Sequence, residues 1–289
     1  MASLIDIRRR LRSVKSTQQI TKAMKMVAAA KLRRAQDRVV GARPYAKLLA
    51  EVLAPVTAHA GELKHPLLAA RTEKRVIVMV VAGDRGLCGA FNTNVHRATA
   101  HLLSSHPEWA EVRLLPVGKK AVEYWKRRKY PFTEKTYAGI LGSLKYGYAS
   151  EIAGFLSGEF LAERIDAAYV VANEFRSILS QVVRTVKLLP LSPEAAAKPA
   201  EGPSIDYIYE PDAASILEWL LPRYLEFTIF RALAESAAAE MGARMTAMDS
   251  ASKNAGELID SLTLTYNRAR QARITKELIE IVSGAAALG

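Results

Sequence analysis

The residues best suited to chemistry lie in a glycine-rich turn between a predicted strand and a predicted helix. The turn, Gly83–Gly89, reads Gly-Asp-Arg-Gly-Leu-Cys-Gly, and dinucleotide-binding proteins place a glycine-rich turn at the same point of their fold. Its Gly-x-x-Gly-x-x-Gly spacing differs from their Gly-x-Gly-x-x-Gly, and it is not a Gly-Lys-Ser/Thr phosphate loop. The first acidic residues downstream, Glu108 and Glu111, match a ribose-binding acid only weakly. We therefore interpret the segment as a tight strand-to-helix turn, with a nucleotide site as the alternative.

Cys88 is the only cysteine and the candidate nucleophile of this turn. Arg85 lies close to it in sequence, but no general base does, because the nearest histidine is His96 in the following helix. His96 and His101 are five residues apart, a spacing that does not align on a helix face. The sequence thus predicts no catalytic residue, no metal and no cofactor. One cysteine also excludes an internal disulfide framework or a cysteine-based zinc site, and it fits a reducing compartment.

The composition indicates a folded protein with a sizeable core. Half of the 289 residues are apolar, which is enough for one large domain or two modest ones. The longest purely apolar run, Val76–Ala82, has seven residues, whereas about 18 are needed to cross a bilayer. The Arg-rich start of the chain resembles a transit peptide, but its helical pattern continues to about Gly41. We therefore expect mature structure, no spanning segment and a cytoplasmic, bacterial-type protein.

The net charge of +12 is concentrated at the N-terminus. Met1–Val40 holds eleven Lys/Arg against two Asp, a net of +9, whereas Arg223–Ser283 holds eight of each sign. Clustered Lys/Arg is typical of nucleic-acid binding, which is one alternative. Against it, no aromatic residue precedes Tyr45, and the charges alternate with an apolar stripe. A solvated or partner-facing helix face is the preferred interpretation, and a protein partner lined with carboxylates would suit it.

The N-terminal helix is predicted from Ile5 to about Val39 and carries a heptad seam. The seam positions alternate in spacings of four and three, which favours a left-handed coiled coil; they are Ile7, Leu11, Val14, Gln18, Thr21, Lys25, Ala28, Leu32, Ala35 and Val39. Its middle is polar, and this weakens a coiled coil. Gly41 and Arg43-Pro44 are expected to end or kink the helix, with more helix from Tyr45 to about His59.

The C-terminal helix is too long for its own chain to enclose. Arg223–Ser283 contains no proline, and its 61 residues would form a rod of roughly 90 Å. Its seam runs from Leu225 through Ile229, and the later positions are small residues that let a partner backbone come close; they are Ala232, Ser236, Ala239, Ala243, Thr246 and Ser250. Pro222 should kink or divide the helix. We expect the two terminal helices to pair antiparallel, with the C-terminal one projecting beyond its partner.

The middle of the chain alternates strands with helices, which indicates a parallel α/β sheet. The predicted strands are 75–82, 112–117, 166–174, 180–188 (near a sheet edge) and 205–210, and the predicted helices are 90–104, 118–129 and 149–164. The predicted fold class is α/β, a long antiparallel coiled coil with an inserted Rossmann-like α/β domain. Its segments are residues 1–60 (first helix), 74–205 (inserted domain) and 206–289 (last helix).

The end of the C-terminal helix, Ile274–Ala287, is an amphipathic tip. Ile274, Leu278, Ile281 and Val282 share one face, which should not be left in water. We expect this tip to be inserted into a partner.

This tip, with Tyr266–Ala272 before it, closely resembles the signature of the gamma subunit of F-type ATP synthases. Ile20–Ala29, Asp84–Gly89 and Tyr207–Pro211 are similar to the same family, in the same order along the chain. The resemblance implies a rotating axle inside a ring of three alpha and three beta subunits, with the α/β domain against the epsilon subunit and the membrane-embedded c-ring. It implies that catalysis belongs to beta and that neither a cofactor nor nucleic acid is bound.

The resemblance also implies which residues make contacts. Residues facing the other helix and the beta subunits would be Met24, Lys25, Arg244, Gln271, Thr275, Glu277 and Glu280. Tyr207 and Tyr209 would lie in the foot region near the c-ring and epsilon. The protein would be peripheral, at the cytoplasmic face of the bacterial plasma membrane, and would meet the membrane only through the c-ring.

Overall fold

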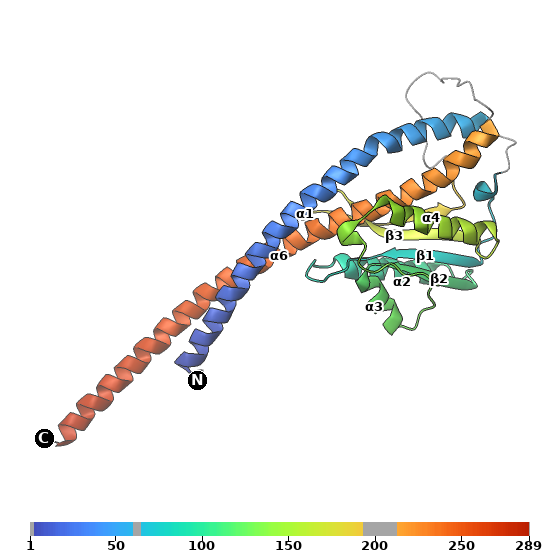
Figure 1. The fold of residues 1–289 in the computed structure, drawn as a ribbon. Helices are drawn as coiled ribbons and strands as arrows, with labels where there is room; N and C mark the ends of the chain where they lie inside the picture. The colour runs from blue at the N-terminus through green and yellow to red at the C-terminus, as the bar shows by residue number, and fades with distance from the viewer. Residues whose placement is uncertain (1–2, 60–64, 193–212, 289) are drawn as a thin grey trace. The chain divides into compact units, whose positions relative to one another are not determined.

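The computed structural model describes residues 3–59, 65–192 and 213–288 (Figure 1). The chain divides into two compact units. We call Ala29–Arg244 the sheet unit, and Met1–Ala28 together with Met245–Gly289 the coiled-coil unit. Helix α1 (Leu4–His59) and helix α6 (Ala213–Leu288) each contribute to both units. The helices and strands predicted from sequence are largely confirmed, with the corrections given below.

The sheet unit contains a four-stranded sheet in the order β2-β1-β3-β4. Strands β1 (Arg75–Val81), β2 (Glu111–Val117) and β3 (Ala167–Phe175) are parallel. Strand β4 (Gln181–Leu189) pairs antiparallel with β3 at the edge. The prediction of an edge strand here is confirmed, while the prediction of a parallel sheet holds for three strands of the four. The predicted strand 205–210 lies outside the described residues.

Helices cover both faces of the sheet, which explains why β1 is apolar and buried from Val76 to Val81. Ile77, Met79 and Val81 belong to a core shared with α4 (Tyr146–Leu161) and with the parts of α1 and α6 in this unit. Val78 and Val80 face the opposite core, formed with α2 (Phe91–Ser105) and α3 (Lys119–Arg127). Figure 1 shows α4 on one side of the strands and α2 and α3 on the other. Two short 3-10 turns, Pro66–Leu68 and Leu141–Ser143, lie in the described part of the sheet unit.

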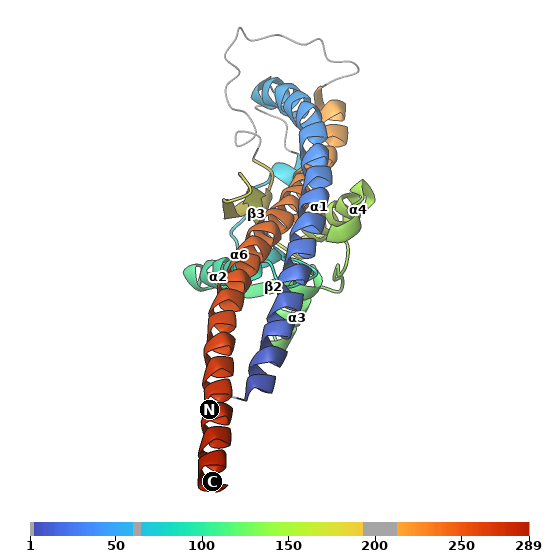
Figure 2. The ribbon, with the colours of Figure 1, turned by 90° about the vertical axis from the view of Figure 1, so that its left-hand side faces the viewer.

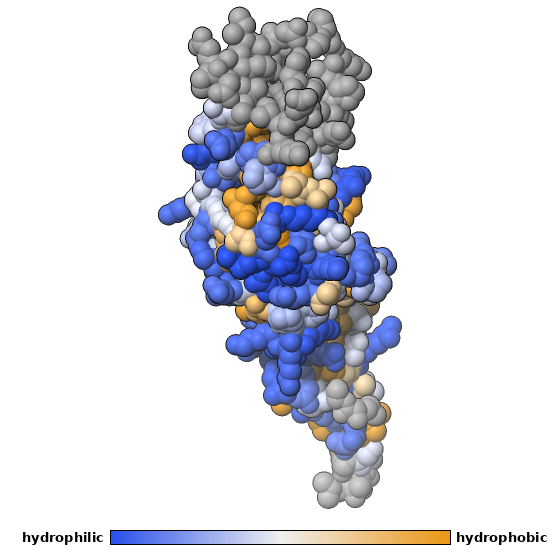
Figure 3. All heavy atoms as spheres, turned by 90° about the vertical axis from the view of Figure 1, so that its right-hand side faces the viewer, coloured by the Kyte–Doolittle hydropathy of each residue, from blue (hydrophilic) through white to orange (hydrophobic). Residues whose placement is uncertain are grey.

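Most of the apolar side chains of the sheet unit are buried between its layers. The face drawn in Figure 3 is largely hydrophilic, with hydrophobic side chains in small separate patches. Among the residues that the structure describes, none of the helices is long and apolar enough to cross a membrane.

Both terminal helices continue through their predicted break points. For α1 the prediction was an end or a kink at Gly41 and Arg43-Pro44; the helix does not end there, and Figure 1 shows that it curves along its length. Relative to alanine, an interior glycine destabilises a helix by about 1 kcal/mol and an interior proline by about 3 kcal/mol. Tertiary packing offsets this, because Leu49 is buried and the Tyr45 ring lies 5.2 Å from that of Phe227. Pro222 likewise lies inside α6 and does not divide it.

The coiled-coil unit pairs the two helices antiparallel, as predicted. Gln18 Nε2 donates to the carbonyl of Ser252 at 3.4 Å, and Lys25 binds Asp249, so α6 numbers rise as α1 numbers fall. The seam positions of α1 in this unit are all buried or half-buried. The small residue Gly256 lets the helices approach, since a Cβ there would lie 3.1 Å from Gln18 Nε2. Figure 2 shows the two helices side by side.

Candidate functional site

The glycine-rich turn binds the chain's own backbone. Asn92 Oδ1 accepts the N–H of Gly83 at 2.8 Å. Asp84 Oδ1 accepts the N–H groups of Lys119 at 3.0 Å and Gly139 at 2.7 Å, which joins three loops at the carboxyl end of the sheet. The side chains of Asp84 and Asn92 are therefore engaged in fixing the shape of the turn.

Helix α6 packs against this turn through a buried ion pair. Arg244 Nη2 lies 2.5 Å from Glu240 Oε1 and donates to the carbonyl of Gly86 at 3.3 Å. The two side chains are only 9% and 4% exposed. Burial raises the pKa of Glu240, and the Arg244 guanidinium opposes that rise. A Cβ on Gly83 would lie 2.8 Å from Glu240 Cδ, so glycine is what lets the carboxylate reach the turn.

Cys88 anchors the same contact from its apolar side. The side chain is 1% exposed and packs with Phe91 and Ala239. Burial raises the pKa of its thiol, so the reactive thiolate is disfavoured. The turn thus provides a packing surface for α6, which supports the interpretation of Gly83–Gly89 as a structural turn. The hypothesis that Cys88 is a nucleophile is left without support.

The second polar contact lies in the coiled-coil unit. Lys25 Nζ lies 2.5 Å from Asp249 Oδ1, and Lys253 Nζ lies 3.2 Å from Asp249 Oδ2. Lys25 and then Lys253 lower the pKa of Asp249. Lys25 was expected at a helix–helix position, and it forms this contact.

The other expected site residues are distributed along the helices and form no cluster. Met24 is half-buried on α1. The remaining residues of the set on α6 are fully on the surface; they are Gln271, Thr275, Glu277 and Glu280. Glu277 accepts from Arg273 and Glu280 pairs with Lys276, each within one turn of α6. Tyr207 and Tyr209 lie outside the described residues.

Sequence reasoning missed Glu240 and Asp249, the acidic partners of Arg244 and Lys25. Asp249 had a signal, because it precedes Ser250 of the predicted α6 seam and lies level with Lys25 once the helices are antiparallel. Glu240 is four residues before Arg244, a spacing that forms ion pairs on a helix. No sequence pattern indicated that Glu240 would be buried against the glycine-rich turn.

The end of α6 has no partner helix within the described chain. Every residue from Arg270 to Ser283 is exposed. The apolar ones are exposed by 48% to 67%; they are Ile274, Leu278, Ile279, Ile281 and Val282. An apolar surface of this kind marks a site for another protein.

Comparisons with known proteins agree with these features. A family model described as ATP synthase matches residues 3–288. The ATP synthase gamma chain of Pelotomaculum thermopropionicum is 50% identical over the full length of both chains. The gamma chain of Geotalea uraniireducens is 49% identical and covers 98% of each.

The chain belongs to the ATP synthase gamma family.

Solved structures of ATP synthases contain chains with the same fold. A chain from the Tetrahymena thermophila mitochondrial ATP synthase (central stalk and c-ring) has a TM-score of 0.59 at 27% identity, covering 81% of this chain and 99% of that one. A chain from the Euglena gracilis enzyme has a TM-score of 0.68 at 20% identity, covering 99% and 94%. As a member of the gamma family, the chain is a subunit of the ATP synthase complex.

Proposed function

We propose that this chain is the central rotor shaft of an F-type ATP synthase. In this proposal it turns with the proton-driven c-ring inside a ring of three alpha and three beta subunits. It couples rotation to the synthesis or hydrolysis of ATP at beta and supplies no active site of its own. The epsilon subunit and the c-ring bind its foot region, which includes Tyr207 and Tyr209. The chain is then peripheral, at the cytoplasmic face of the bacterial plasma membrane. The similar Tetrahymena structure, described as central stalk and c-ring, supports this assignment.

The observation that carries the proposal is the unpartnered end of α6. Residues 270–283 extend beyond the part of α6 that α1 covers, a length of about 20 Å. Exposed apolar area is unfavourable by about 25 cal/mol per Å², so the tip should be covered in the working assembly. In the proposed assembly, the ring of alpha and beta subunits covers this end of α6.

The contacts of the paired helices also suit a rotating part. Polar residues in the seam, such as Gln18 and Lys25, leave the coiled coil weaker than an all-apolar one. A shaft that passes several copies of one partner should make shallow contacts with each. In this proposal the exposed residues Gln271, Thr275, Glu277 and Glu280 touch beta, while Met24 and Lys25 couple the helices. Arg244 was expected to act with them, but it binds Glu240 of its own helix and the carbonyl of Gly86, so its proposed role is to fix α6 on the glycine-rich turn.

Co-expression with alpha and beta subunits tests the proposal. The full chain should copurify with them and support ATP-driven rotation, while deletion of Ile274–Gly289 should reduce torque or coupling severalfold. Deleting only Ala285–Gly289 is the matched control and should have a much smaller effect. The sheet unit should melt at the same temperature in all three proteins. Failure of the full chain to bind alpha and beta, or unchanged coupling after the longer deletion, would contradict the proposal.

A further inference from the structure

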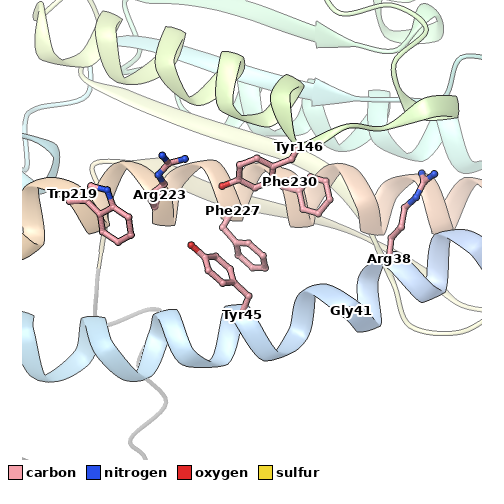
Figure 4. A pocket seen from close by; sticks show the side chains of 8 residues that line it. All are labelled: Arg38, Gly41, Tyr45, Tyr146, Trp219, Arg223, Phe227 and Phe230. Carbon is pink, nitrogen blue, oxygen red and sulfur yellow. The ribbon is translucent and has the colours of Figure 1, made fainter.

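An open groove in the sheet unit has no role in the proposed function. It has a volume of about 590 Å³, within the usual range for small-ligand sites. Its lining comes from three helices: Arg38, Gly41 and Tyr45 from α1, Tyr146 from α4, and Trp219, Arg223, Phe227 and Phe230 from α6 (Figure 4). Five of these eight residues are aromatic, in a chain that is 7% aromatic. The groove is therefore a concentrated aromatic surface.

The rings are held in pairs that join the helices. The ring centroids of Tyr45 and Phe227 lie 5.2 Å apart, and those of Tyr146 and Phe230 lie 5.4 Å apart. Both pairs of rings are tilted relative to each other. The Tyr146 hydroxyl donates to Glu226 Oε2 at 2.9 Å, which fixes that ring. Such a preformed wall can bind a flat apolar group without first becoming ordered.

The floor of the groove is kept open on α1. Gly41 is a helix-interior glycine, which lowers helix stability by about 1 kcal/mol relative to alanine. No protein atom lies within 4 Å of the position where a Cβ would be. Close packing thus does not require glycine here, and a larger side chain would enter the groove.

The groove carries a net positive charge. Arg223 is neutralised by Glu226, with Nη1 at 3.1 Å from Oε2. Glu226 also accepts from Ser150, so its oxygens are already in use. Arg38, at the other end of the groove in Figure 4, forms no hydrogen bond or ion pair with any residue that the structure describes. An unpaired guanidinium at one end of an aromatic groove favours an anionic ligand and disfavours a cationic one, so the groove is a poor site for an ammonium group.

We propose that this groove binds a small amphiphilic anion, with a flat apolar body of aromatic-ring size and one carboxylate, sulfonate or phosphate group. The body lies against Tyr45, Phe227 and Phe230, and the anionic group binds Arg38. Trp219, which is 63% exposed, closes the opposite end. An occupant would touch α1, α4 and α6 at once. This inference does not depend on the proposed rotation.

Fluorine NMR of the full chain labelled with 5-fluorotryptophan tests the proposal. The three tryptophans give three resonances, and Trp219 is the one at the groove, since Trp109 and Trp125 are buried in the α2–α3 core. The probe is naphthalene-2-sulfonate, and Trp219→Phe assigns the signal. We expect a saturable shift of Trp219 alone, with a Kd of about 1 mM for a probe of this size. A trimethylammonium compound with the same ring system should leave the spectrum unchanged.

Variants locate the binding site. Arg38→Gln should weaken binding roughly tenfold through loss of a charge-assisted contact. Arg34→Gln, one turn earlier on α1, is the control for net charge and should change binding less than about twofold. Gly41→Leu should abolish the Trp219 shift by filling the groove. If Gly41→Leu does not fold, the exposed Arg38 still provides the test. The proposal would be overturned if the Trp219 resonance did not shift, or if Arg38→Gln and Arg34→Gln bound the sulfonate equally well. It would also be overturned if the trimethylammonium probe bound as tightly as the sulfonate.

Discussion

Lys25 of α1 and Asp249 of α6 join the two terminal helices through a direct ion pair, with 2.5 Å between Nζ and Oδ1. Lys25 occupies a seam position that an apolar residue would fill in a coiled coil built for stability alone. Both side chains are about a third exposed. The pair therefore specifies how α1 and α6 align in the coiled-coil unit, and it adds little to stability.

Substituting this pair should change alignment more than stability. Asp249→Asn should lower the Tm by less than about 4 °C, because partly exposed pairs are weak. Lys253→Gln, which removes the second cation near Asp249, is the control and should have a smaller effect. Circular dichroism melts with and without added salt provide the measurement. A larger loss than this from Asp249→Asn would show that the pair stabilises the helices, contrary to this account.

The buried pair of Arg244 and Glu240 should behave differently. Arg244→Met leaves a buried carboxylate without its partner and should destabilise the sheet unit by about 3–5 kcal/mol. The double variant Arg244→Met with Glu240→Leu should recover most of that loss. Urea unfolding of the two singles and the double gives the coupling energy. Additive losses would indicate that the residues act independently.

The single variant should also depend on pH with a definite sign. The pKa of Glu240 is raised in the folded protein, and removing Arg244 raises it further. A raised carboxyl pKa stabilises the fold at low pH, and that contribution is lost as pH rises through the folded pKa. The deficit of Arg244→Met should therefore be smaller near pH 5 than at pH 8.

Asp166 at the start of β3 should show the opposite dependence. Its carboxylate accepts from Arg75 Nη2 at 2.7 Å and from the backbone N–H groups of Lys74 and Arg75. The Arg75 contact lowers its pKa from the ordinary 3.8. Its stabilisation is complete above that value and is lost as pH falls through the lower, folded pKa. Asp166→Asn should destabilise the sheet unit by about 2 kcal/mol at pH 7 and flatten the acid unfolding curve. An unchanged curve would be evidence against this role.

Cys88 should be nearly inert towards thiol reagents in the folded protein. It is 1% exposed, and burial raises its pKa. Alkylation by iodoacetamide should become fast only when urea unfolds the chain. Gly83→Ala, which displaces Glu240 from the turn, should accelerate it at low urea concentration. Rapid alkylation of the native protein would contradict the close packing of α6 on this turn.

Local patterns predicted most of the elements. The apolar run of β1 and the heptad spacing of α1 identified a buried strand and a coiled-coil helix, because periodicity reports which faces are buried. Gly41 and Pro44 predicted an end or a kink in α1, but the helix continues through both. The packing of Tyr45 and Leu49 on α6 and the neighbouring core outweighs the low helix propensity of glycine and proline.

The candidate site was less predictable, because its contacts join residues far apart in sequence. Glu240 meets the turn at Gly83 only through the docking of α6 on the sheet. The antiparallel pairing of β4 likewise depends on a hairpin geometry between residues 175 and 181 that the strand patterns do not encode.

In the proposed function this chain rotates as a shaft, and a single-molecule rotation experiment detects that motion itself. A complex of alpha, beta and this chain is fixed to a surface through alpha or beta. A bead is attached to an exposed cysteine introduced on α3. Cys88 does not compete for the bead because it is buried. On addition of ATP we expect steady rotation of the bead in one direction, and this rotation should be lost or weakened when Ile274–Gly289 is deleted. A complex that hydrolyses ATP while the bead stays still or turns at random would contradict it.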